Sequence, residues 1–594
     1  MDKTEGGIFM KKILVAMLAA SMVLGAMTGC NDSETSSGGG GTEGTEGGSS
    51  VSAEGDSNVN PAGEFPIVKE PITLHFFAEA DMTEEAVSDL ESNKLLEYIE
   101  ETSNIDLEFT FLSYSAEGKQ QMILSFASGE YPDGAMMTWN TMMNKTDIMN
   151  YGASEGICIP LNSYIEEYGV ETKNIFSLRP ESEAAITAPD GNIYGLPRFT
   201  ECGHCMAYPK LWFNYQWLEN LGLEEPQTTE ELYNVLKAFK TQDPNGNGVQ
   251  DEVGLTGAID FSCAVEYWLM NSFIDCPAFN QSTDPRMFLI WEDDQVKFMA
   301  NTEEYREGLE WIKKMYDEGL IDPANFTQAD DSLLQQVQSG EDGVAVVGGY
   351  TSDHLSMGLD YNNVELASQY HALPPVEGPE GVRYQPYNPA SNQLAGFNFV
   401  IFDTCENPEA AFRLADWFLS EEMTYNLHYG LKGHGWLEPE AGQTNIAGGE
   451  YKCAIQNLPA DASEEEEKEF NSYKLGFLAP SADLKERRDA WSPGVTGIDD
   501  PLLDTQYESR LEWETQRVDD YWPEVSLPSA IFMDEADAAE FAELRLNINQ
   551  CVVQNTSMFI TGARSLDEWD AYCQELEGYG LDRYVELYSQ AYNG

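Results

Sequence analysis

Apolar segments of strand length alternate with amphipathic segments of helical length in the first part of the chain, and this alternation constrains the fold most. Residues 72–77 have the composition of a strand, residues 93–102 repeat apolar side chains at helical spacing, and residues 105–112 again predict a strand. A helix over 120–128 then precedes a buried strand over 134–137. Strands that alternate with helices indicate a parallel α/β sheet.

Similar segments follow further along the chain. Helices are predicted over 215–221 and over 229–240, the second with a threonine cap and acidic residues in its first turn. Buried strands are predicted over 344–350 and 395–401, and one long helix over 408–425. The C-terminal part of the chain is expected to be mainly helical.

The chain is long enough for more than one folded unit. Beyond its N-terminal segment, the 594-residue sequence exceeds what one hydrophobic core usually supports. A turn at 189–192 followed by an extended stretch is a candidate crossing between two units. We predict a first lobe over 65–196, to which about 372–425 returns, and a second lobe over 197–371 that also holds the mainly helical 426–594.

The N-terminus has the three regions of a secretory signal peptide. Lys11 and Lys12 precede an apolar run over 13–27, and small residues lead from this run to Cys30. The run is shorter than the roughly 20 residues that span a bilayer, and no later stretch is long and apolar enough to replace it. Residues 1–30 are therefore predicted to be a signal peptide.

Cys30 is a candidate for lipid attachment. Small residues immediately before a cysteine resemble the bacterial lipobox, in which the cysteine carries a diacylglycerol, although Met27 stands where leucine is usual. The Gly-, Ser-, Thr- and Glu-rich residues 31–64 cannot bury enough apolar area to fold, so they predict a disordered tether. We expect a protein held by lipid at the outer face of the cell membrane. A plain signal peptide with a chance cysteine is the alternative.

The charge balance excludes nucleic-acid binding. The chain has 32 Lys plus Arg against 103 Asp plus Glu, which gives a formal net charge of -71. This charge repels phosphate backbones and anionic lipid headgroups. Because the acidic residues are spread along the sequence, they indicate a solvated surface and say little about the ligand.

We expect the protein to be a monomer.

A loop over 243–252 has the composition of a cation site. Oxygen-bearing side chains fall at loop positions 1, 3, 5, 9 and 10, a backbone carbonyl is available at position 7, and Gly248 at position 6 permits a sharp turn. We predict a structural calcium ion rather than magnesium, because the ligands are many and all come from the protein. An Asx-rich turn without an ion is the alternative. The predicted ligands are Asp243, Asn245, Asn247, the backbone of Val249, Asp251 and Glu252.

Cys202-Gly203-His204-Cys205 has the literal sequence of a disulfide-isomerase active site, which needs its first thiolate at a helix N-terminus. The following Met-Ala-Tyr-Pro argues against such a helix. A structural disulfide, two free thiols and a chance motif remain as alternatives, and two cysteines beside one histidine fall short of a closed zinc site. The cysteines have no repeated spacing that would indicate a full disulfide framework.

Several stretches together resemble the extracellular solute-binding proteins of ABC importers, in the sugar-type family that includes alginate-oligosaccharide and maltodextrin binders. The matching stretches are 210–214 with 217–223, 229–248, 316–323, 407–411 and 559–562. The resemblance implies a two-lobed α/β fold of the periplasmic-binding-protein type II, with hinge segments and a ligand in the cleft between the lobes. It implies a binding protein and not an enzyme, which delivers a small ligand, in the first place an oligosaccharide, to permease subunits.

Sugars are bound by aromatic faces and by planar polar groups at strand ends and in the loops that follow them. For each candidate aromatic residue, core packing is the alternative, and for each candidate charged residue a surface ion pair is. The predicted ligand-binding residues are Glu79, Asp81, Trp139, Arg198, Trp268, Tyr350 and Trp436.

Two other functions fit parts of the sequence. An extracellular glycoside hydrolase needs only two carboxylates at a suitable separation, but no motif isolates such a pair, and neither a Gly-x-Ser-x-Gly elbow nor a His-Glu-x-x-His zinc helix is found. A receptor of the same fold that binds peptides or serves a sensor is the other alternative.

Overall fold

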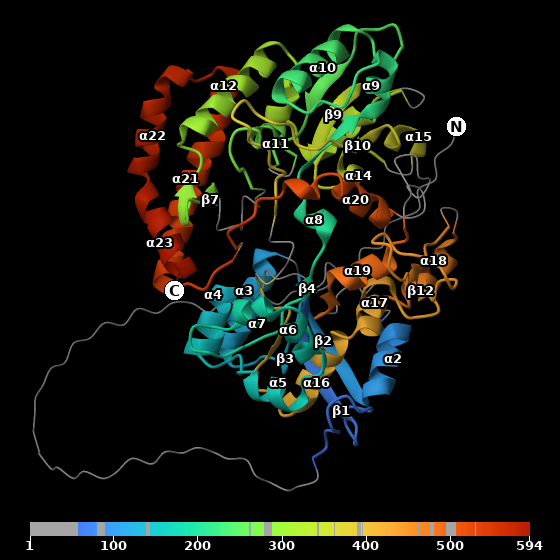
Figure 1. Ribbon diagram of the computed structural model, residues 1–594. Helices are drawn as coiled ribbons and strands as arrows, with labels where there is room; N and C mark the ends of the chain where they lie inside the picture. Colours follow the sequence, from blue (N-terminus) through green and yellow to red (C-terminus); the bar gives the residue numbers. More distant parts are fainter. Residues whose placement is uncertain are drawn as a thin grey trace, which may run out of the picture. The chain divides into compact units, whose positions relative to one another are not determined.

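The computed structural model describes most of the chain after the N-terminal segment, and two four-stranded sheets organise it (Figure 1). The description leaves out residues 1–56, 80–89, 114, 138–142, 261–262, 278–287, 341–343, 361–362, 389–393, 395, 460–461, 476–479, 495–506, 529 and 594. The predicted lipidation site Cys30, the candidates Asp81 and Trp139, and most of the predicted tether therefore lie outside the described residues.

The first sheet contains the strands predicted in the N-terminal half. Its order is β11-β3-β1-β2, with β1 (Ile72–Glu79), β2 (Ile105–Leu112), β3 (Gly134–Met136) and β11 (Phe399–Ile401). β1 runs parallel to β2 and to β3, as the alternation of strands and helices predicts. β11 runs antiparallel to β3, so a late segment of the chain completes the sheet.

Side-chain caps set the ends of helices next to this sheet. Asn93 caps α2 (Lys94–Ser103) by accepting backbone N–H bonds, and α3 (Ala116–Ser128) ends at Gly129 in the left-handed region. The prediction of one helix over 408–425 is wrong. Ser420 is extended and caps a new helix, which divides the segment into α16 (Pro408–Phe418) and α17 (Glu421–Tyr429).

The second sheet is mixed, which the expectation of a parallel sheet misses. Its order is β10-β5-β9-β6, with β5 (Lys210–Asn214), β6 (Val253–Thr256), β9 (Val347–Ser352) and β10 (Tyr370–Ala372). β6 runs parallel to β9, but β5 runs antiparallel to both β9 and β10.

The remaining elements surround these sheets. In the first part of the chain they are η1 (Leu90–Ser92), α4 (Lys145–Ile148), η2 (Met149–Ser154), α5 (Asn162–Tyr168), α6 (Glu171–Leu178), α7 (Pro180–Ile186), β4 (Phe199–Thr200) and α8 (Gly203–Met206). In the middle part they are α9 (Tyr215–Leu221), α10 (Thr229–Thr241), α11 (Val265–Met270), β7 (Leu289–Glu292), β8 (Gln295–Phe298), α12 (Glu303–Asp317), η3 (Pro323–Phe326), α13 (Asp330–Val337), α14 (Leu355–Gly358) and α15 (Val364–Ala367).

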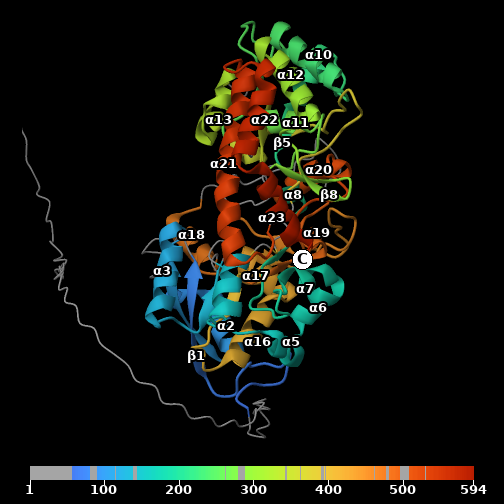
Figure 2. The ribbon, with the colours of Figure 1, turned by 90° about the vertical axis from the view of Figure 1, so that its left-hand side faces the viewer.

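The C-terminal part is mainly helical, as predicted. Its elements are β12 (Trp436–Leu437), β13 (Ala454–Ile455), α18 (Glu464–Asn471), β14 (Ala482–Asp483), α19 (Lys485–Trp491), α20 (Tyr507–Thr515), η7 (Asp519–Tyr521), α21 (Glu535–Thr561), η8 (Leu566–Glu568), α22 (Trp569–Gly578) and α23 (Leu581–Asn593). The long α21 packs against α12 and α23 (Figure 2). Among the described residues, no helix combines the length and the apolar character that a membrane crossing requires.

Each sheet has its own hydrophobic core. One core holds Leu74, Phe76 and Phe399 of the first sheet, and the other holds Trp212 and Tyr350 of the second. The chain therefore builds two folded units rather than one large core, in agreement with its length.

The chain passes between the two cores more than once. It leaves the first core after Phe199, returns to it after Val376 and leaves again after Leu484. The buried residues Leu475 and Ala482, which the predicted lobe boundaries assign to the second lobe, pack in the first core, whereas α21 to α23 pack in the second.

Candidate functional site

The predicted cation loop lies between α10 and β6 and curls back on itself. Asp243, Gly246 and Gly248 have φ angles of 50°, 70° and 78°, in the left-handed region that permits a tight loop. The Gly248 N–H donates to Asp243 Oδ2 at 3.1 Å, and the Asn247 amide donates to Asp251 Oδ1 at 3.2 Å. Asn245 Oδ1 also accepts a bond from the Asn247 N–H. Together these bonds hold four predicted ligands, Asp243, Asn245, Asn247 and Asp251, close to one another.

Glu252 is the residue whose surroundings call for a further partner. Both of its carboxylate oxygens are buried and have no hydrogen-bond partner among the described residues. Burial raises the pKa of Glu252, and the nearby charges of Asp251 and Asp243 raise it further. A buried carboxylate without a partner is costly, and a hard cation with oxygen ligands removes that cost. The residues present in the loop therefore fit a calcium ion.

Arg198 lies at the first passage between the cores, next to β4. β4 pairs in parallel with β14, which brings Thr200 beside Asp483. Arg198 Nη2 donates to Asp483 Oδ2 at 2.9 Å, and His428 Nε2 lies 2.7 Å from Asp483 Oδ1. Arg488 Nη1 is 3.9 Å from Asp483 Oδ2. We call these four residues, Arg198, His428, Asp483 and Arg488, the crossing cluster.

The charges of the crossing cluster compensate one another. Burial alone would raise the pKa of Asp483, but the charges of His428 and Arg198 outweigh this effect and hold the pKa well below its usual value. Burial lowers the pKa of His428, and the Asp483 carboxylate counters this only in part. Arg198 Nε is buried and has no hydrogen-bond partner among the described residues. Arg198 thus has a structural role as the partner of the buried Asp483.

Two predicted aromatic residues lie inside the second core. Trp268 on α11 is 1% exposed, and Tyr350 on β9 is fully buried with its hydroxyl donating to the Leu355 carbonyl at 2.9 Å. Their burial favours the core-packing alternative for both residues. Glu79 is the last residue of β1, where it pairs with Leu112 of β2.

Trp436 is one of the residues that line a surface pocket of about 510 Å³. Its indole N–H donates to Asn426 Oδ1 at 3.0 Å, and the Lys432 ammonium lies over its ring at 5.0 Å. The residues that line this pocket are Glu421, Glu422, Tyr425, Lys432, Trp436, Glu438, Pro439, Glu440, Ala441, Gly442, Gln443, Glu450, Tyr451 and Lys452.

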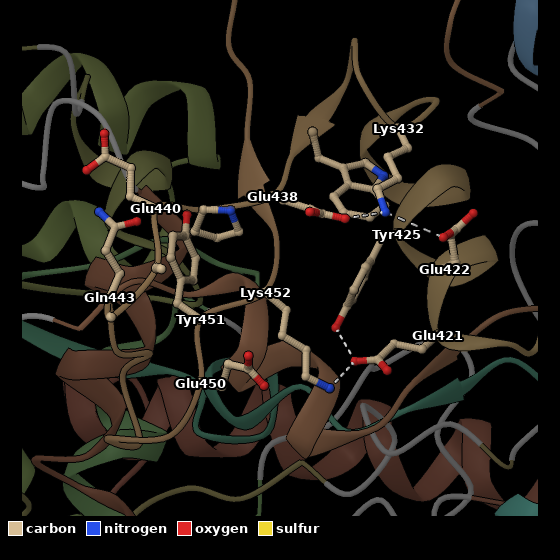
Figure 3. Close-up of a pocket in the computed structure, with 14 residues that line it drawn as sticks. Glu421, Glu422, Tyr425, Lys432, Glu438, Glu440, Gln443, Glu450, Tyr451 and Lys452 are labelled. Carbon is tan, nitrogen blue, oxygen red and sulfur yellow. Dashed lines mark hydrogen bonds and ion pairs between the residues drawn. The ribbon is translucent and has the colours of Figure 1, made fainter.

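The rim of this pocket is made of charged pairs. Glu421 accepts bonds from Tyr425 at 2.8 Å and from Lys452 at 2.9 Å, and Lys432 contacts Glu438 at 2.8 Å, as Figure 3 shows. Trp436 is only 3% exposed, so the pocket offers carboxylates, amides and ammonium groups rather than an open aromatic face. This lining suits hydroxyl-rich molecules.

Cys202 and Cys205 are joined by a disulfide in this structure. The sequence argument against a helix at this motif is wrong, because Gly203–Met206 form the single-turn α8 with Cys202 as its N-cap. The turn is short enough to end before the proline at position 209.

His428, Asp483 and the pocket residues Glu421 and Lys452 were not predicted from the sequence. The members of the crossing cluster come from separate parts of the chain, so no local spacing in the sequence predicts the cluster. The one available indication was the position of Arg198 at a predicted crossing, where charged partners from other segments are expected.

Two α/β units, each with its own sheet and core and linked by repeated passages of the chain, define the fold of two-lobed solute-binding proteins. Residues 87–425 match the bacterial extracellular solute-binding protein family, and the chain belongs to this family. It is therefore a binding protein and not an enzyme, as the resemblance implies.

Individual relatives agree with this assignment. The chain is 27% identical over 555 residues to the fructooligosaccharide ABC transporter substrate-binding protein FusA of Streptococcus pneumoniae, covering 89% of this chain and 91% of FusA. A solved structure of the FusA EF-hand mutant in complex with fructo-nystose has a TM-score of 0.63 at 24% identity, covering 88% of this chain and 99% of that one. An extracellular solute-binding protein from Bifidobacterium longum subsp. infantis has a TM-score of 0.68 at 21% identity, covering 88% and 98%.

Proposed function

We propose that the protein is lipid-anchored at the outer face of the cell membrane, captures an oligosaccharide and delivers it to the permease of an ABC importer. The observation that carries the proposal is the match to a fructooligosaccharide-binding protein along 89% of this chain. Fructo-nystose, the sugar bound in the FusA complex, is the first ligand to test. Cys30 would carry the lipid, and residues 31–56 would let the folded part stand away from the membrane. The predicted tether ends too late, because Val59 forms a β-bridge with Val68 and the Glu64 carbonyl accepts a bond from Arg413 at 2.7 Å.

The ligand would bind between two lobes, whose open and closed populations it shifts. The proposed lobes are 65–196 with 372–425 and 197–371 with 426–594. The two hydrophobic cores support this division, except that Phe199, Leu427, Leu475, Ala482 and Leu484 pack in the first core and Ala372, Leu373 and Val376 pack in the second. Repeated passages of the chain between the cores support hinge segments, because closure then needs changes only in the connections.

Arg198 and Trp139 are the proposed ligand-binding residues with the clearest arguments. Arg198 keeps a buried Nε donor without a partner among the described residues, and a sugar hydroxyl can accept from it. Trp139 follows β3, at the carboxyl end where α/β sheets present ligands. Glu79 is the last residue of the neighbouring strand β1, and Asp81 comes two positions later in the sequence; both would supply acceptors for hydroxyl groups.

We propose a structural calcium ion in the loop 243–252. Asp243, Asn245, Asn247, Asp251 and Glu252 would hold it with the Val249 carbonyl. The partnerless carboxylate of Glu252 supports the proposal, as does the existence of an EF-hand mutant of a protein with the same fold. The ion would neutralise this carboxylate and fix the connection between α10 and β6.

Tryptophan fluorescence titrated with fructo-nystose tests the ligand assignment. Trp139→Ala is expected to weaken binding by about tenfold, because an aromatic contact contributes on the order of 1 kcal/mol beyond the area it buries. Trp291→Phe is the matched control, since Trp291 packs against Tyr592 and is not among the predicted ligand residues. Equal affinity of the Trp139 variant and the wild type would remove Trp139 from the site.

A panel of peptides distinguishes the alternative receptor of the same fold. A peptide-binding or sensor-coupled protein would saturate with a peptide or would lack a permease partner, whereas the proposed importer component saturates with an oligosaccharide. Co-purification with the permease subunits tests delivery. Recovery of the subunits with the sugar-loaded protein, and no recovery with a sugar-free chain truncated at Cys30, would support it.

A further inference from the structure

Three side chains able to bind a soft metal lie within one turn of the chain at the first passage between the cores. The ligand atoms of Cys202, His204 and Cys205 all lie within 4.8 Å of one another. Cys205 Sγ is 3.7 Å from His204 Nδ1. Zinc bonds of about 2.3 Å to sulfur and about 2.0–2.1 Å to nitrogen place neighbouring atoms of a tetrahedral site roughly 3.3–3.8 Å apart. The sulfur and nitrogen are already at the separation that such a site requires.

A fourth ligand of the right kind approaches from another element. His354 follows β9 and forms the N-cap of α14. Its ring centroid lies 5.5 Å from that of His204. His354 is therefore within reach of the same metal ion after a change of side-chain rotamer. Two cysteines with two histidines form a complete structural zinc site.

The backbone around Cys202 also suits a thiolate. The Cys205 N–H donates to Cys202 Sγ at 3.2 Å, and a bond from an N–H stabilises a negatively charged sulfur more than a neutral one. Cys202 is fully buried, whereas Cys205 is partly exposed, so solvent and reagents can reach the pair. The turn can therefore accommodate the two cysteines as thiolates as well as in the disulfide.

The disulfide between Cys202 and Cys205 contributes little to the stability of the fold. The two cysteines are only three positions apart, and a disulfide stabilises least when the loop that it closes is short. Seven further cysteines in the described part of the chain are free thiols, five of them buried. The chain therefore does not use disulfides as its general means of stabilisation, and this pair calls for another role.

We propose that the reduced protein binds one zinc ion through Cys202, His204, Cys205 and His354. A dithiol reductant first transfers two electrons and two protons to the disulfide and becomes a disulfide itself, which leaves two thiols on the protein. Zinc then replaces the two thiol protons, which pass to the buffer. The two thiolates balance the charge of the ion, so the neutral site is compatible with the buried Lys210, whose ammonium donates to the His204 carbonyl at 2.9 Å.

Zinc binding would compete with a contact of the crossing cluster. Arg488 Nη2 lies 3.3 Å from His204 Nε2, and because arginine only donates, Nε2 accepts in this contact. Coordination through Nδ1 places the proton on Nε2 and releases Arg488. The released guanidinium remains near Asp483, at 3.9 Å. The metal state of the turn is therefore linked to an ion cluster that joins two passages of the chain.

The test is a zinc titration of the calcium-saturated mature chain with and without prior reduction. After reduction by a phosphine or dithiol reagent and removal of excess metal, elemental analysis is expected to find one zinc per chain. Cobalt in place of zinc should give the absorption of a tetrahedral thiolate complex. The unreduced protein should retain no zinc above the level of a Cys202→Ser, Cys205→Ser variant.

Two variants separate this site from its alternatives. His354→Ala should weaken zinc binding by at least about tenfold, as losses of metal-supporting residues do. His75→Ala, a matched histidine variant on β1 of the first sheet, should leave it unchanged. Zinc retention by the reduced wild type at the level of the double serine variant would overturn the proposal. Full retention by the His354 variant would overturn the four-ligand site.

Discussion

Two buried carboxylates in this chain have opposite surroundings, one with charged partners and one without. In the crossing cluster, Asp483 is fully buried but contacts Arg198 at 2.9 Å and His428 at 2.7 Å, and its pKa is held below its usual value. In the cation loop, both oxygens of Glu252 are buried without a partner among the described residues, and burial raises its pKa.

The difference shows that the protein completes a charge cluster by itself at the crossing but supplies no compensating charge in the loop, where we propose that a bound ion supplies it. A buried carboxylate needs a compensating charge or must become neutral. Three parts of the chain supply that charge at the crossing, because β4 and β14 lie side by side there. The loop 243–252 after α10 contains no Lys, Arg or His, so none of its own side chains can supply a compensating positive charge.

The largest expected effect comes from removing the anion of the crossing cluster. Asp483→Asn leaves the Arg198 guanidinium without its counter-charge and His428 without its carboxylate partner. We therefore expect the free energy of unfolding to fall by about 3–5 kcal/mol, as when one partner of a buried pair is removed. Urea denaturation of the calcium-loaded protein measures this change.

Glu486→Gln is the control for this substitution. Glu486 lies on the adjacent α19, pairs with Arg179 and has a side chain that is 66% exposed, so its loss should cost no more than about 1 kcal/mol. Similar losses for the two variants would show that Asp483 is not compensated by a buried cluster.

Calcium removal is expected to have the next largest effect. At a calcium concentration of a hundred times the dissociation constant, binding adds about 2.7 kcal/mol to the free energy of unfolding, and chelation removes it. Calorimetry with calcium and with EDTA measures the difference in melting temperature. In Glu252→Gln the two scans should nearly coincide. A wild-type melting temperature that does not change when EDTA is added would contradict a calcium site in this loop.

The pH dependence of stability should distinguish the histidine of the crossing cluster. The pKa of His428 is lowered in the folded protein, so the unfolded chain takes up a proton first as the pH falls below about 6.5, and stability is lost, by at most about 1.4 kcal/mol per pH unit. Asp483 contributes no change in this range, because its lowered pKa matters only below about pH 4.

Comparison with His428→Gln isolates this effect. Glu266, with a pKa raised to about 7 by burial, stabilises the folded protein on acidification, and it is present in both proteins. Denaturation between pH 7.5 and 5 should therefore give a less positive dependence of stability on pH in the variant. Parallel curves for the two proteins would mean that His428 has the same pKa in both states.

The smallest effect is expected at the surface pocket. Lys432→Met removes an ion pair with Glu438, whose side chain is 76% exposed, and the contact of the ammonium with the Trp436 ring. Exposed pairs of this kind contribute about 0–1 kcal/mol. A loss in denaturation experiments as large as that of Asp483→Asn would place this pocket among the buried clusters.

Local sequence sufficed for much of the first sheet. The cation site over 243–252 stays a prediction that rests on ligands close together in sequence. The predicted strand over 105–112 is β2, and the predicted helix over 229–240 is α10 with one more residue.

Long-range pairing set the limit of prediction. The antiparallel position of β5 in the second sheet depends on partners from distant segments, and the end of α16 depends on Ser420 preferring a cap to a helix interior. Arg198 was singled out by its place at a crossing, but His428 and Asp483 carried no indication in their own neighbourhoods. The burial of Trp268 and Tyr350 shows the same limit, because a strand-end or helix position does not say which face the core covers.

Capture of an oligosaccharide is tested most directly by equilibrium titration of the calcium-loaded mature protein with fructo-nystose and a panel of neutral and acidic oligosaccharides, followed by mass spectrometry of the recovered sugar. We expect saturable binding of one oligosaccharide per chain and recovery of that sugar intact. Absence of saturable binding to every oligosaccharide, or recovery of shorter products, would contradict it.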